Sequence, residues 1–275
     1  MNRTAAVRLL SAAIAVGVVV ACDDDDPVAP RLDPPTNVVA TQQSATEIRV
    51  TWTAGVGATS YLVQRAPGAN PTSFAQVGGG LVTGTTFDDE VPAPGTYVYR
   101  VASVSANDTS AFATTATATT TETFNAALNG ANERPTPRTT PATGTGVITF
   151  RNDTLRWTID LTNITNVTAA HIHTGGAEEA GGIIQNLAGP SAPPNYSSTG
   201  PNNTQIAGFV TRAGFVTPSA PNAGVTFDSL LALMRNGNAY VNVHTNNTAN
   251  DPTNNTGPGD FPGGEIRGQT VRQGA

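Results

Sequence analysis

The sequence contains no lysine: all 14 of its basic residues are arginine, set against 20 acidic residues. Schiff-base chemistry and P-loop nucleotide binding both depend on a lysine amine, so the chain excludes these two activities. The formal net charge of −6 also opposes nucleic-acid binding, because a basic surface must neutralise the phosphates. No nucleic-acid partner is therefore expected.

Cysteine and charged residues are scarce as well. A single cysteine, Cys22, excludes an intrachain disulfide, and charged residues make up only 12% of the chain. The helix formers Glu and Gln are few, whereas Thr and Val recur in alternating runs that are typical of strands. The composition predicts an all-β protein stabilised by sheet packing and long enough for two domains.

The start of the chain has the order of a bacterial export signal. Arg3 and Arg8 precede the uncharged run Leu9–Ala21, whose 13 residues are fewer than the roughly 20 needed to cross a bilayer. Val19-Val20-Ala21-Cys22 resembles the lipobox of bacterial lipoproteins, in which the cysteine sulfur is acylated and the signal is cut just before it. The resemblance implies lipidation of Cys22, which leaves no free thiol.

The segment after the signal is expected to be a solvated tether. Cleavage removes residues 1–21 with two arginines and no acidic residue, so 12 basic residues remain against 20 acidic ones, a balance of −8. Asp23–Asp26 cannot pack into a core, and the Pro-rich stretch Pro27–Pro35 follows. Residues 22–33 are therefore predicted as a lipidated acidic tether. Its acyl chains would hold the protein on a membrane of the bacterial cell envelope, outside the cytoplasm.

Residues 34–121 show the short alternating strands of a β-sandwich. Ile48, Val50 and Trp52 share one face of an expected strand over 47–52, because side chains alternate across a strand. Turn residues separate this strand from the next ones at the spacing of a sandwich. The further expected strands cover residues 61–65, 85–89 and 94–101.

Two features make this segment resemble a fibronectin type III domain. Trp52 matches the tryptophan of that family's second strand, and Pro94-Gly95-Thr96-Tyr97 matches a stretch before its sixth strand, with one residue fewer. The resemblance implies that Tyr97 forms a tyrosine corner, its hydroxyl bonded to nearby backbone. It favours a spacer over a module with a ligand of its own. Ala113–Thr123, nearly all Ala and Thr, is expected to be the last strand, a linker, or both.

Four distinctive stretches occur in residues 123–272: ALNGANERP at 127–135, AAHIH at 169–173, GNAYVNVHT at 237–245 and GGEIRGQ at 263–269. In this order they resemble the CHRD domain, a module named after the animal protein chordin and also found in exported bacterial proteins. Because that family has no generally established activity, the resemblance implies an extracytoplasmic binding or structural module. A protein or glycan at the cell surface is the ligand class that this interpretation favours.

The residue pattern of the second segment is also β-rich by itself. Leu155, Trp157 and Ile159 alternate with polar residues, which predicts a strand with one buried face. One helix is predicted over residues 228–235, stopped at Gly237, with its Leu and Met side chains assigned to packing. The whole chain is thus predicted to fold as two tandem antiparallel β-sandwiches behind the anchor.

All three histidines fall in this second segment. His171 and His173 are two residues apart, so on a strand they share a face while Ile172 points to the other. If Ile172, Val241, Val243 and Ile266 face the core, the same alternation places a polar set on the outer face. That set comprises His171, His173, Asn242, His244, Glu265 and Arg267.

Two interpretations of the histidines stay open. Three converging imidazoles suit Cu or Zn, and a His-x-His strand with a distant histidine is similar to part of the Cu/Zn superoxide dismutase site, although that two-metal enzyme needs more histidines and a disulfide. In this case Glu265 or Asn242 would orient a ring, and Arg267 would lie near an open coordination position. The other interpretation is a structural hydrogen-bonded network. The chain has neither Gly-x-Ser-x-Gly nor His-Glu-x-x-His, so enzymatic activity is not expected, and a copper/zinc redox enzyme is the alternative that the histidines leave open.

Overall fold

A computed structural model of the protein describes residues 31–113, 115–193, 197–198, 205–218, 222–247 and 258–274. The expected signal peptide, Cys22 and nearly all of the tether lie outside these residues, so lipidation remains a prediction. Within the described ranges, no helix is both long and apolar enough to cross a membrane.

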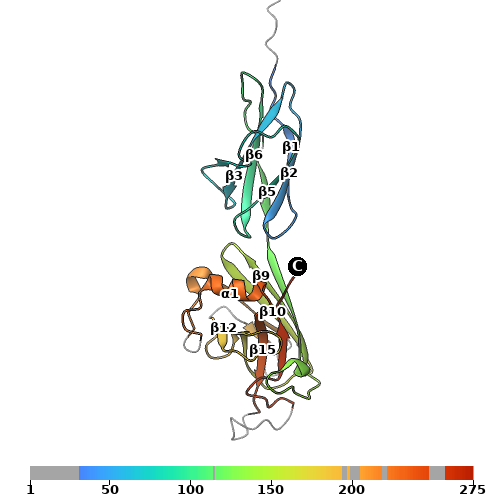
Figure 1. Cartoon of the computed structure of the whole chain (residues 1–275), viewed down its shortest axis with the longest axis vertical. Helices are drawn as coiled ribbons and strands as arrows, with labels where there is room; N and C mark the ends of the chain where they lie inside the picture. The colour runs from blue at the N-terminus through green and yellow to red at the C-terminus, as the bar shows by residue number, and fades with distance from the viewer. Residues whose placement is uncertain are drawn as a thin grey trace, which may run out of the picture. The chain divides into compact units, whose positions relative to one another are not determined.

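The N-terminal sandwich consists of two antiparallel sheets, of which Figure 1 shows the main strands in blue to green. One sheet has the order β1-β2-β5 and the other the order β4-β3-β6-β7. The four expected strands correspond to β2, β3, β5 and β6, and β7 occupies part of the Ala/Thr segment. The bounds are β1 Thr36–Gln42, β2 Glu47–Thr53, β3 Ser60–Pro67, β4 Ala75–Gln76, β5 Thr86–Glu90, β6 Thr96–Val104 and β7 Ala116–Thr119.

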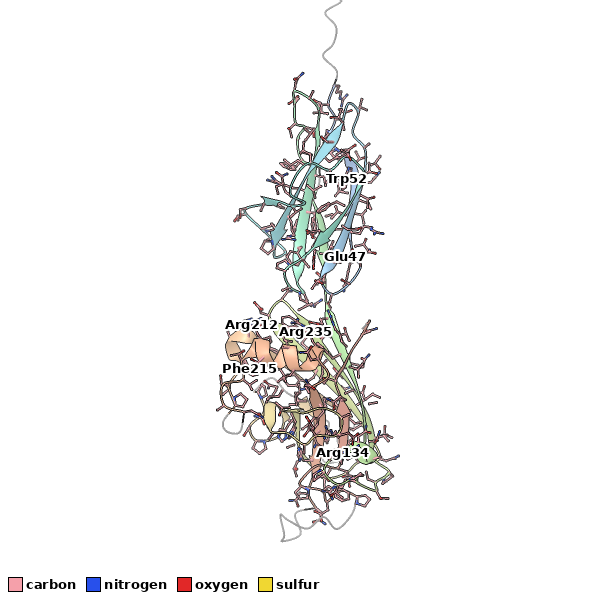
Figure 2. The ribbon with its side chains drawn as sticks, in the orientation of Figure 1. Glu47, Trp52, Arg134, Arg212, Phe215 and Arg235 are labelled. Atoms are coloured by element: carbon pink, nitrogen blue, oxygen red, sulfur yellow. The ribbon has the colours of Figure 1, made fainter. Side chains whose placement is uncertain are left out.

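The core of this sandwich is the predicted one. Ile48, Val50 and Trp52 are all buried along one face of β2, and the Trp52 ring (Figure 2) meets the Tyr61 ring of the opposite sheet edge-on at 5.2 Å between centroids. The Tyr97 hydroxyl donates to the Ala93 carbonyl at 2.7 Å. This hydrogen bond is the tyrosine corner that the resemblance implied.

The C-terminal sandwich is built from one long antiparallel sheet with the order β12-β11-β15-β16-β8-β9-β10-β14-β13, to which β17 adds beside β8. It folds over one core, since apolar residues of β11 and β14, from opposite ends of the order, belong to the same buried cluster. The fold class is therefore all-β and antiparallel, as predicted. The bounds are β8 Glu122–Asn129, β9 Thr143–Arg151, β10 Thr154–Thr162, β11 Val167–Thr174, β12 Ile183–Ala188, β13 Ser197–Ser198, β14 Gln205–Thr211, β15 Ala239–Thr245, β16 Ile266–Gln269 and β17 Val271–Arg272; the short helices η1 and η2 span Gly130–Asn132 and Arg212–Gly214.

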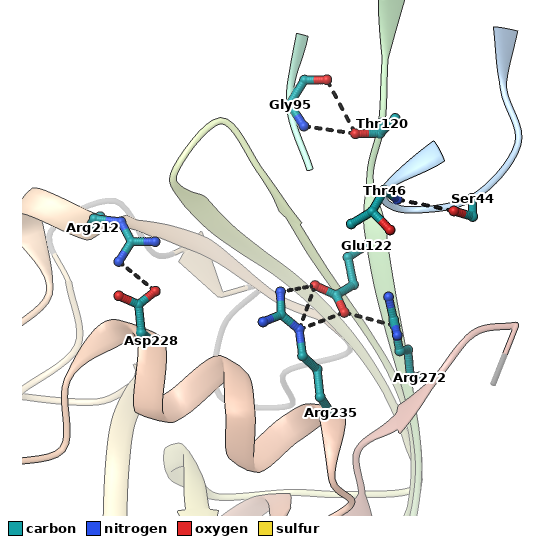
Figure 3. A network of polar contacts seen from close by, with 9 residues as sticks. All are labelled: Ser44, Thr46, Gly95, Thr120, Glu122, Arg212, Asp228, Arg235 and Arg272. Carbon is teal, nitrogen blue, oxygen red and sulfur yellow. Dashed lines mark hydrogen bonds and ion pairs between the residues drawn. The ribbon is translucent and has the colours of Figure 1, made fainter. Parts of the chain in front are cut away.

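One α-helix, α1 (Phe227–Arg235), covers this core and closely matches the predicted span. Thr226 caps its start by accepting a hydrogen bond from the Ser229 amide, and Gly237 follows its end with φ +69°, a conformation that favours glycine. Its last residue, Arg235, is tied to the sheet by Glu122, which is 1% exposed and also pairs with Arg272 (Figure 3). The Arg235–Glu122 pair therefore ties α1 to β8 of the sheet.

The register of three neighbouring strands positions the histidine face. β11 pairs with β15 so that His171 lies opposite Asn242, and β15 pairs with β16 so that Asn242 lies opposite Arg267. On the other face of the same strands, Ile172, Val241, Val243 and Ile266 are fully buried in the core. The alternation predicted from the sequence is confirmed for this face.

Candidate metal centre

The three histidines come together on the polar face of β11 and β15. His171 and His173 lie on β11, and His244 follows two positions after Asn242 on β15. One nitrogen from each ring can be chosen so that all three lie within 4.8 Å of one another. Ring centroids are 4.8 Å apart for His171 and His244, 5.5 Å for His171 and His173, and 5.8 Å for His173 and His244.

Backbone carbonyls fix the tautomers of two rings. The Nδ1 atom of His173 lies 2.9 Å from the Gly181 oxygen, and the Nδ1 atom of His244 lies 2.9 Å from the Pro262 oxygen. A carbonyl can only accept, so both Nδ1 atoms carry the proton and both Nε2 atoms present a lone pair when the rings are neutral. A second hydrogen bond of this kind is the usual way in which a metal-binding imidazole is oriented.

The inward-facing nitrogens have little else to bind. Nε2 of His173 is buried and has no hydrogen-bond partner among the described residues. Nε2 of His244 lies 3.1 Å from Nδ1 of His171, and because His244 already has its proton on Nδ1, His171 is the donor in this contact. The three rings therefore converge, and a single proton, on Nδ1 of His171, lies between His171 and His244.

Burial keeps these imidazoles neutral. Desolvation lowers the pKa of His171 to about 3 and that of His173 to about 4, with smaller contributions from repulsion by the neighbouring histidines. The pKa of His244 is also lowered, mainly by desolvation, against a raising effect of the Pro262 carbonyl. Neutral imidazole is the form that coordinates a metal ion.

The polar face is covered, which the sequence did not indicate. Asn242, Glu265 and Arg267 were expected on an outer face, yet they are 4%, 0% and 1% exposed. The 175–182 loop is hydrogen-bonded to this face at Arg267, and the 258–265 loop, which contains Glu265, contacts His244 through the Pro262 carbonyl. The first loop is held by hydrogen bonds from Arg267 to Gly176, from Gln269 to Gly175 and from Gly181 to Tyr240, and by the ion pair of Arg134 (Figure 2) with Glu178 at 2.9 Å.

Glu265 and Asn242 do not have the orienting role that we predicted for them. Both Glu265 oxygens accept hydrogen bonds, from Thr140 and Thr245 hydroxyls at 2.5 and 2.7 Å and from the Gly259 amide at 2.9 Å. The Asn242 amide donates to Glu133 at 3.4 Å. Neither side chain bonds a histidine ring in the described residues, and the carbonyls of Gly181 and Pro262 orient the rings instead.

Arg267 lies one aromatic ring away from the histidines. Its guanidinium carbon is 3.5 Å from the centroid of the Tyr240 ring, and Tyr240 stacks on His173 with 5.1 Å between centroids and an interplanar angle of 12°. Its Nη2 atom donates to the Gly176 carbonyl at 2.6 Å, whereas Nη1 is buried without a partner among the described residues. The positive charge of Arg267 contributes to the lowered pKa of His173.

Glu133 is a buried carboxyl that the sequence reasoning missed, although it lies within the ALNGANERP stretch. Burial raises its pKa to about 7, against the lowering effects of Arg267 and Asn242, and its Oε1 atom has no partner among the described residues. Gly264, with φ +122°, passes so close that a Cβ there would lie 2.6 Å from Asn242 Oδ1 and 2.9 Å from Glu133 Oε2. The site therefore has a second polar layer beside the histidines.

Fold and site together define a class: an all-β protein with a cluster of three neutral histidines on two adjacent strands. The model of the CHRD domain family matches residues 124–251, a range that includes all three histidines and Glu133. No curated protein matched the chain.

Three of the solved structures that are similar to part of the chain carry a fibronectin type III (FN3) domain in their names. The structure named FN3tt is 16% identical with a TM-score of 0.28, over 32% of this chain and 94% of that one. A Fn3-like protein from Clostridium thermocellum is 26% identical with a TM-score of 0.27, over 32% and 91% of the two chains. The fn3 domain of the human collagen alpha-1(XX) chain is 24% identical with a TM-score of 0.28, over 33% and 86%.

Proposed function

We propose that this protein is a lipid-anchored binding module of the bacterial cell envelope whose CHRD domain holds one transition-metal ion, Zn²⁺ or Cu²⁺. The ligands are His171, His173 and His244. The observation that carries the proposal is the buried Nε2 lone pair of His173, which has no partner among the described residues while Nδ1 of the same ring is held by a carbonyl. A buried acceptor without a partner costs about 1–3 kcal/mol, which coordination of an ion would offset.

The chemistry of the donors supports Zn²⁺ or Cu²⁺ over other ions. Imidazole suits Zn and Cu, whereas Mg²⁺ and Ca²⁺ take oxygen ligands. A purely structural histidine network would pair its buried nitrogens with one another or with the backbone. Nδ1 of His173, Nδ1 of His244 and the His171–His244 contact are paired in this way, whereas Nε2 of His173 has no such partner among the described residues. We propose binding of the ion, without turnover of a substrate.

The proposed lipid anchor would determine where in the cell the module is located. Lipidation of Cys22 would fix the chain to a membrane, and the acidic tether and the first sandwich would act as spacers. Intact mass of the mature protein should show diacylglycerol on residue 22. A Cys22→Ala protein should leave the membrane fraction, and its retention there in detergent-sensitive form would contradict the anchor.

Metal binding is tested on the full, untagged protein solubilised in detergent, because a polyhistidine tag would bind the same ions. Calorimetric titration of metal-free protein with Zn²⁺ and with Cu²⁺ should give one site per chain, abolished in His173→Ala. The variant Gln185→Ala, on neighbouring β12, serves as a control that should bind normally. Affinity weaker than about millimolar, roughly −4 kcal/mol, or binding unchanged in the triple histidine-to-alanine protein, would contradict the proposal.

A further inference from the structure

All three donors of the proposed metal site are uncharged, so the site does not neutralise the ion that it holds. Among the described residues, no carboxylate is hydrogen-bonded to a histidine ring. The buried carboxyl groups of this face and its covering loop are bonded elsewhere: Glu265 accepts from Thr140, Thr245 and Gly259, Glu133 accepts from Asn242, and Asp260 accepts from the Asn247 amide. A bound divalent ion would therefore keep its full charge of +2.

A cation, Arg267, stacks next to the ligands through one aromatic ring. Arg267 lies against Tyr240 and Tyr240 lies against His173, so a buried guanidinium follows the metal ligand in one continuous stack. The Nη1 atom of Arg267 is buried and unpartnered within the described residues. This charge adds to the positive potential at the ion, because a partly buried charge is screened far less than a surface one.

Three protein ligands leave one position of a tetrahedral ion free. His173 is buried, but His171 and His244 are partly exposed, so the cluster reaches solvent on one side. Water can enter there, and a metal-bound water in positive surroundings is readily replaced by an anion.

From this arrangement we infer that the loaded site binds a small anion as its fourth ligand, and that Arg267 strengthens this binding through its charge. In the exchange one metal–water bond breaks and one metal–anion bond forms, and nothing is oxidised or reduced. The ligand class is small monovalent anions that coordinate through nitrogen, oxygen or a halide. The inference rests on the proposed metal site.

The test uses azide as the anion and imidazole as an uncharged competitor for the same position. The full detergent-solubilised protein is loaded with Cu²⁺, stoichiometry is confirmed by metal analysis, and each ligand is titrated while the visible spectrum is recorded. Azide should give a saturable charge-transfer band. In Arg267→Gln the azide affinity should fall about tenfold, equivalent to about 1.4 kcal/mol, while the imidazole affinity stays within about twofold.

Two variants separate charge from structure. Arg267→Lys keeps the charge and should retain azide affinity within about threefold. Arg267→Met, which also removes the charge, replaces the glutamine variant if that protein fails to fold. Arg156→Gln, an exposed arginine that stacks on Phe209 of β14, should change neither ligand. Equal loss of azide and imidazole affinity on removing the charge would show that Arg267 only shapes the pocket, and would overturn the inference.

Failure of the two proposals can be told apart. Stoichiometric Cu²⁺ binding with no spectral response to azide up to about 100 mM would overturn the anion site and leave the metal site standing. Absence of stoichiometric metal binding would overturn both.

Discussion

The two sandwiches differ in how they treat buried polar groups. In the first, the Tyr99 hydroxyl donates to Asp89 at 2.6 Å and Arg65 donates to the same oxygen at 2.7 Å. The three side chains of this buried polar cluster are therefore hydrogen-bonded to one another. In the second, the histidine face leaves several buried atoms without partners among the described residues. These are His173 Nε2, Glu133 Oε1, Asn242 Oδ1, Arg267 Nη1 and Gln269 Oε1.

This difference separates a scaffold from a site. Unpaired buried polar atoms cost stability, so a fold keeps them where a ligand completes them or where water is trapped. Among the described residues, the first sandwich has two such atoms, Trp52 Nε1 and Ser103 Oγ, and the polar cluster beside its core is paired, which fits a spacer. The second sandwich has seven, and all but Arg138 Nε and Trp157 Nε1 belong to the histidine face.

The largest expected effect tests whether the two regions are independent at all. Trp52 and Trp157 are buried in separate hydrophobic clusters, and truncating either to Ala should cost about 3–5 kcal/mol. In calorimetric melting, Trp52→Ala should lower only the first domain's transition and leave metal binding intact. Trp157→Ala should do the reverse. One substitution that lowers both transitions together would show that residues 34–121 and 123–272 unfold as one unit.

The second effect is a pH dependence confined to the second sandwich. Burial raises the pKa of Glu133 to about 7 from a reference of 4.5, so between these values the folded state holds a proton that the unfolded state has lost. Glu133 should therefore contribute a loss of stability as pH rises from about 4.5 to about 7, of up to about 3 kcal/mol. The three histidines act with the opposite sign in this range, because their lowered pKa values leave them neutral in the folded state while the unfolded state takes up protons below about 6.5. Glu133→Gln cannot ionise, so the stability difference between this variant and the native protein, measured by urea unfolding at a series of pH values, should isolate the Glu133 contribution.

Glu178→Gln is the matched control for that measurement. Glu178 is exposed and its pKa is lowered by Arg134, so its loss should not reproduce the pH-dependent difference expected for Glu133→Gln. If Glu133→Gln and the native protein show the same pH profile, Glu133 is not the group responsible.

A third, smaller effect concerns Gly264, whose backbone lies against the side chains of Asn242 and Glu133. Gly264→Ala should cost about 1–3 kcal/mol, because φ +122° is strained for any side chain and the new Cβ would meet Asn242 and Glu133. Gly237→Ala also has a positive φ, +69°, but a Cβ there meets nothing within 4 Å. Urea unfolding should give the larger loss for Gly264, and only that variant should weaken Zn²⁺ binding. Equal effects would show that the contact is unimportant.

Much of the fold could be predicted because alternation is a local signal. The faces of β2 and β10, the helix α1 with its stop at Gly237, and the shared face of His171, His173 and His244 all follow from side-chain spacing. The tyrosine corner at Tyr97 followed from a short family stretch.

The rest depends on contacts that residue type does not encode. Gly181 and Pro262 orient histidine rings through backbone carbonyls, which every residue has, so no pattern could single them out. The two covering loops turn an expected outer face into a buried one. The first is held by distant partners such as Arg134 and Arg267, and the second by Asn166. Glu133 is separated from Asn242 by 109 positions and meets it only in the folded chain.

The smallest expected effect gives the sharpest contrast between the two regions. In metal-free protein, His173→Leu should change stability by less than about 1 kcal/mol, because the loss of one ring–carbonyl hydrogen bond is offset by removing a buried unpaired acceptor. The Gly181 carbonyl still has the Tyr240 hydroxyl at 3.4 Å as a hydrogen-bond donor.

In the first sandwich, Tyr99→Phe removes a hydrogen bond from a cluster whose side chains are bonded to one another, and should cost about 1.5–3 kcal/mol. With Zn²⁺ at about 100 times its Kd, the native protein should gain about 2.7 kcal/mol, Tyr99→Phe should gain the same, and His173→Leu should gain nothing. Urea unfolding with and without the ion measures all three. A costly His173→Leu in the metal-free state would mean that this histidine serves the fold, as Tyr99 does, and the contrast between scaffold and site would disappear.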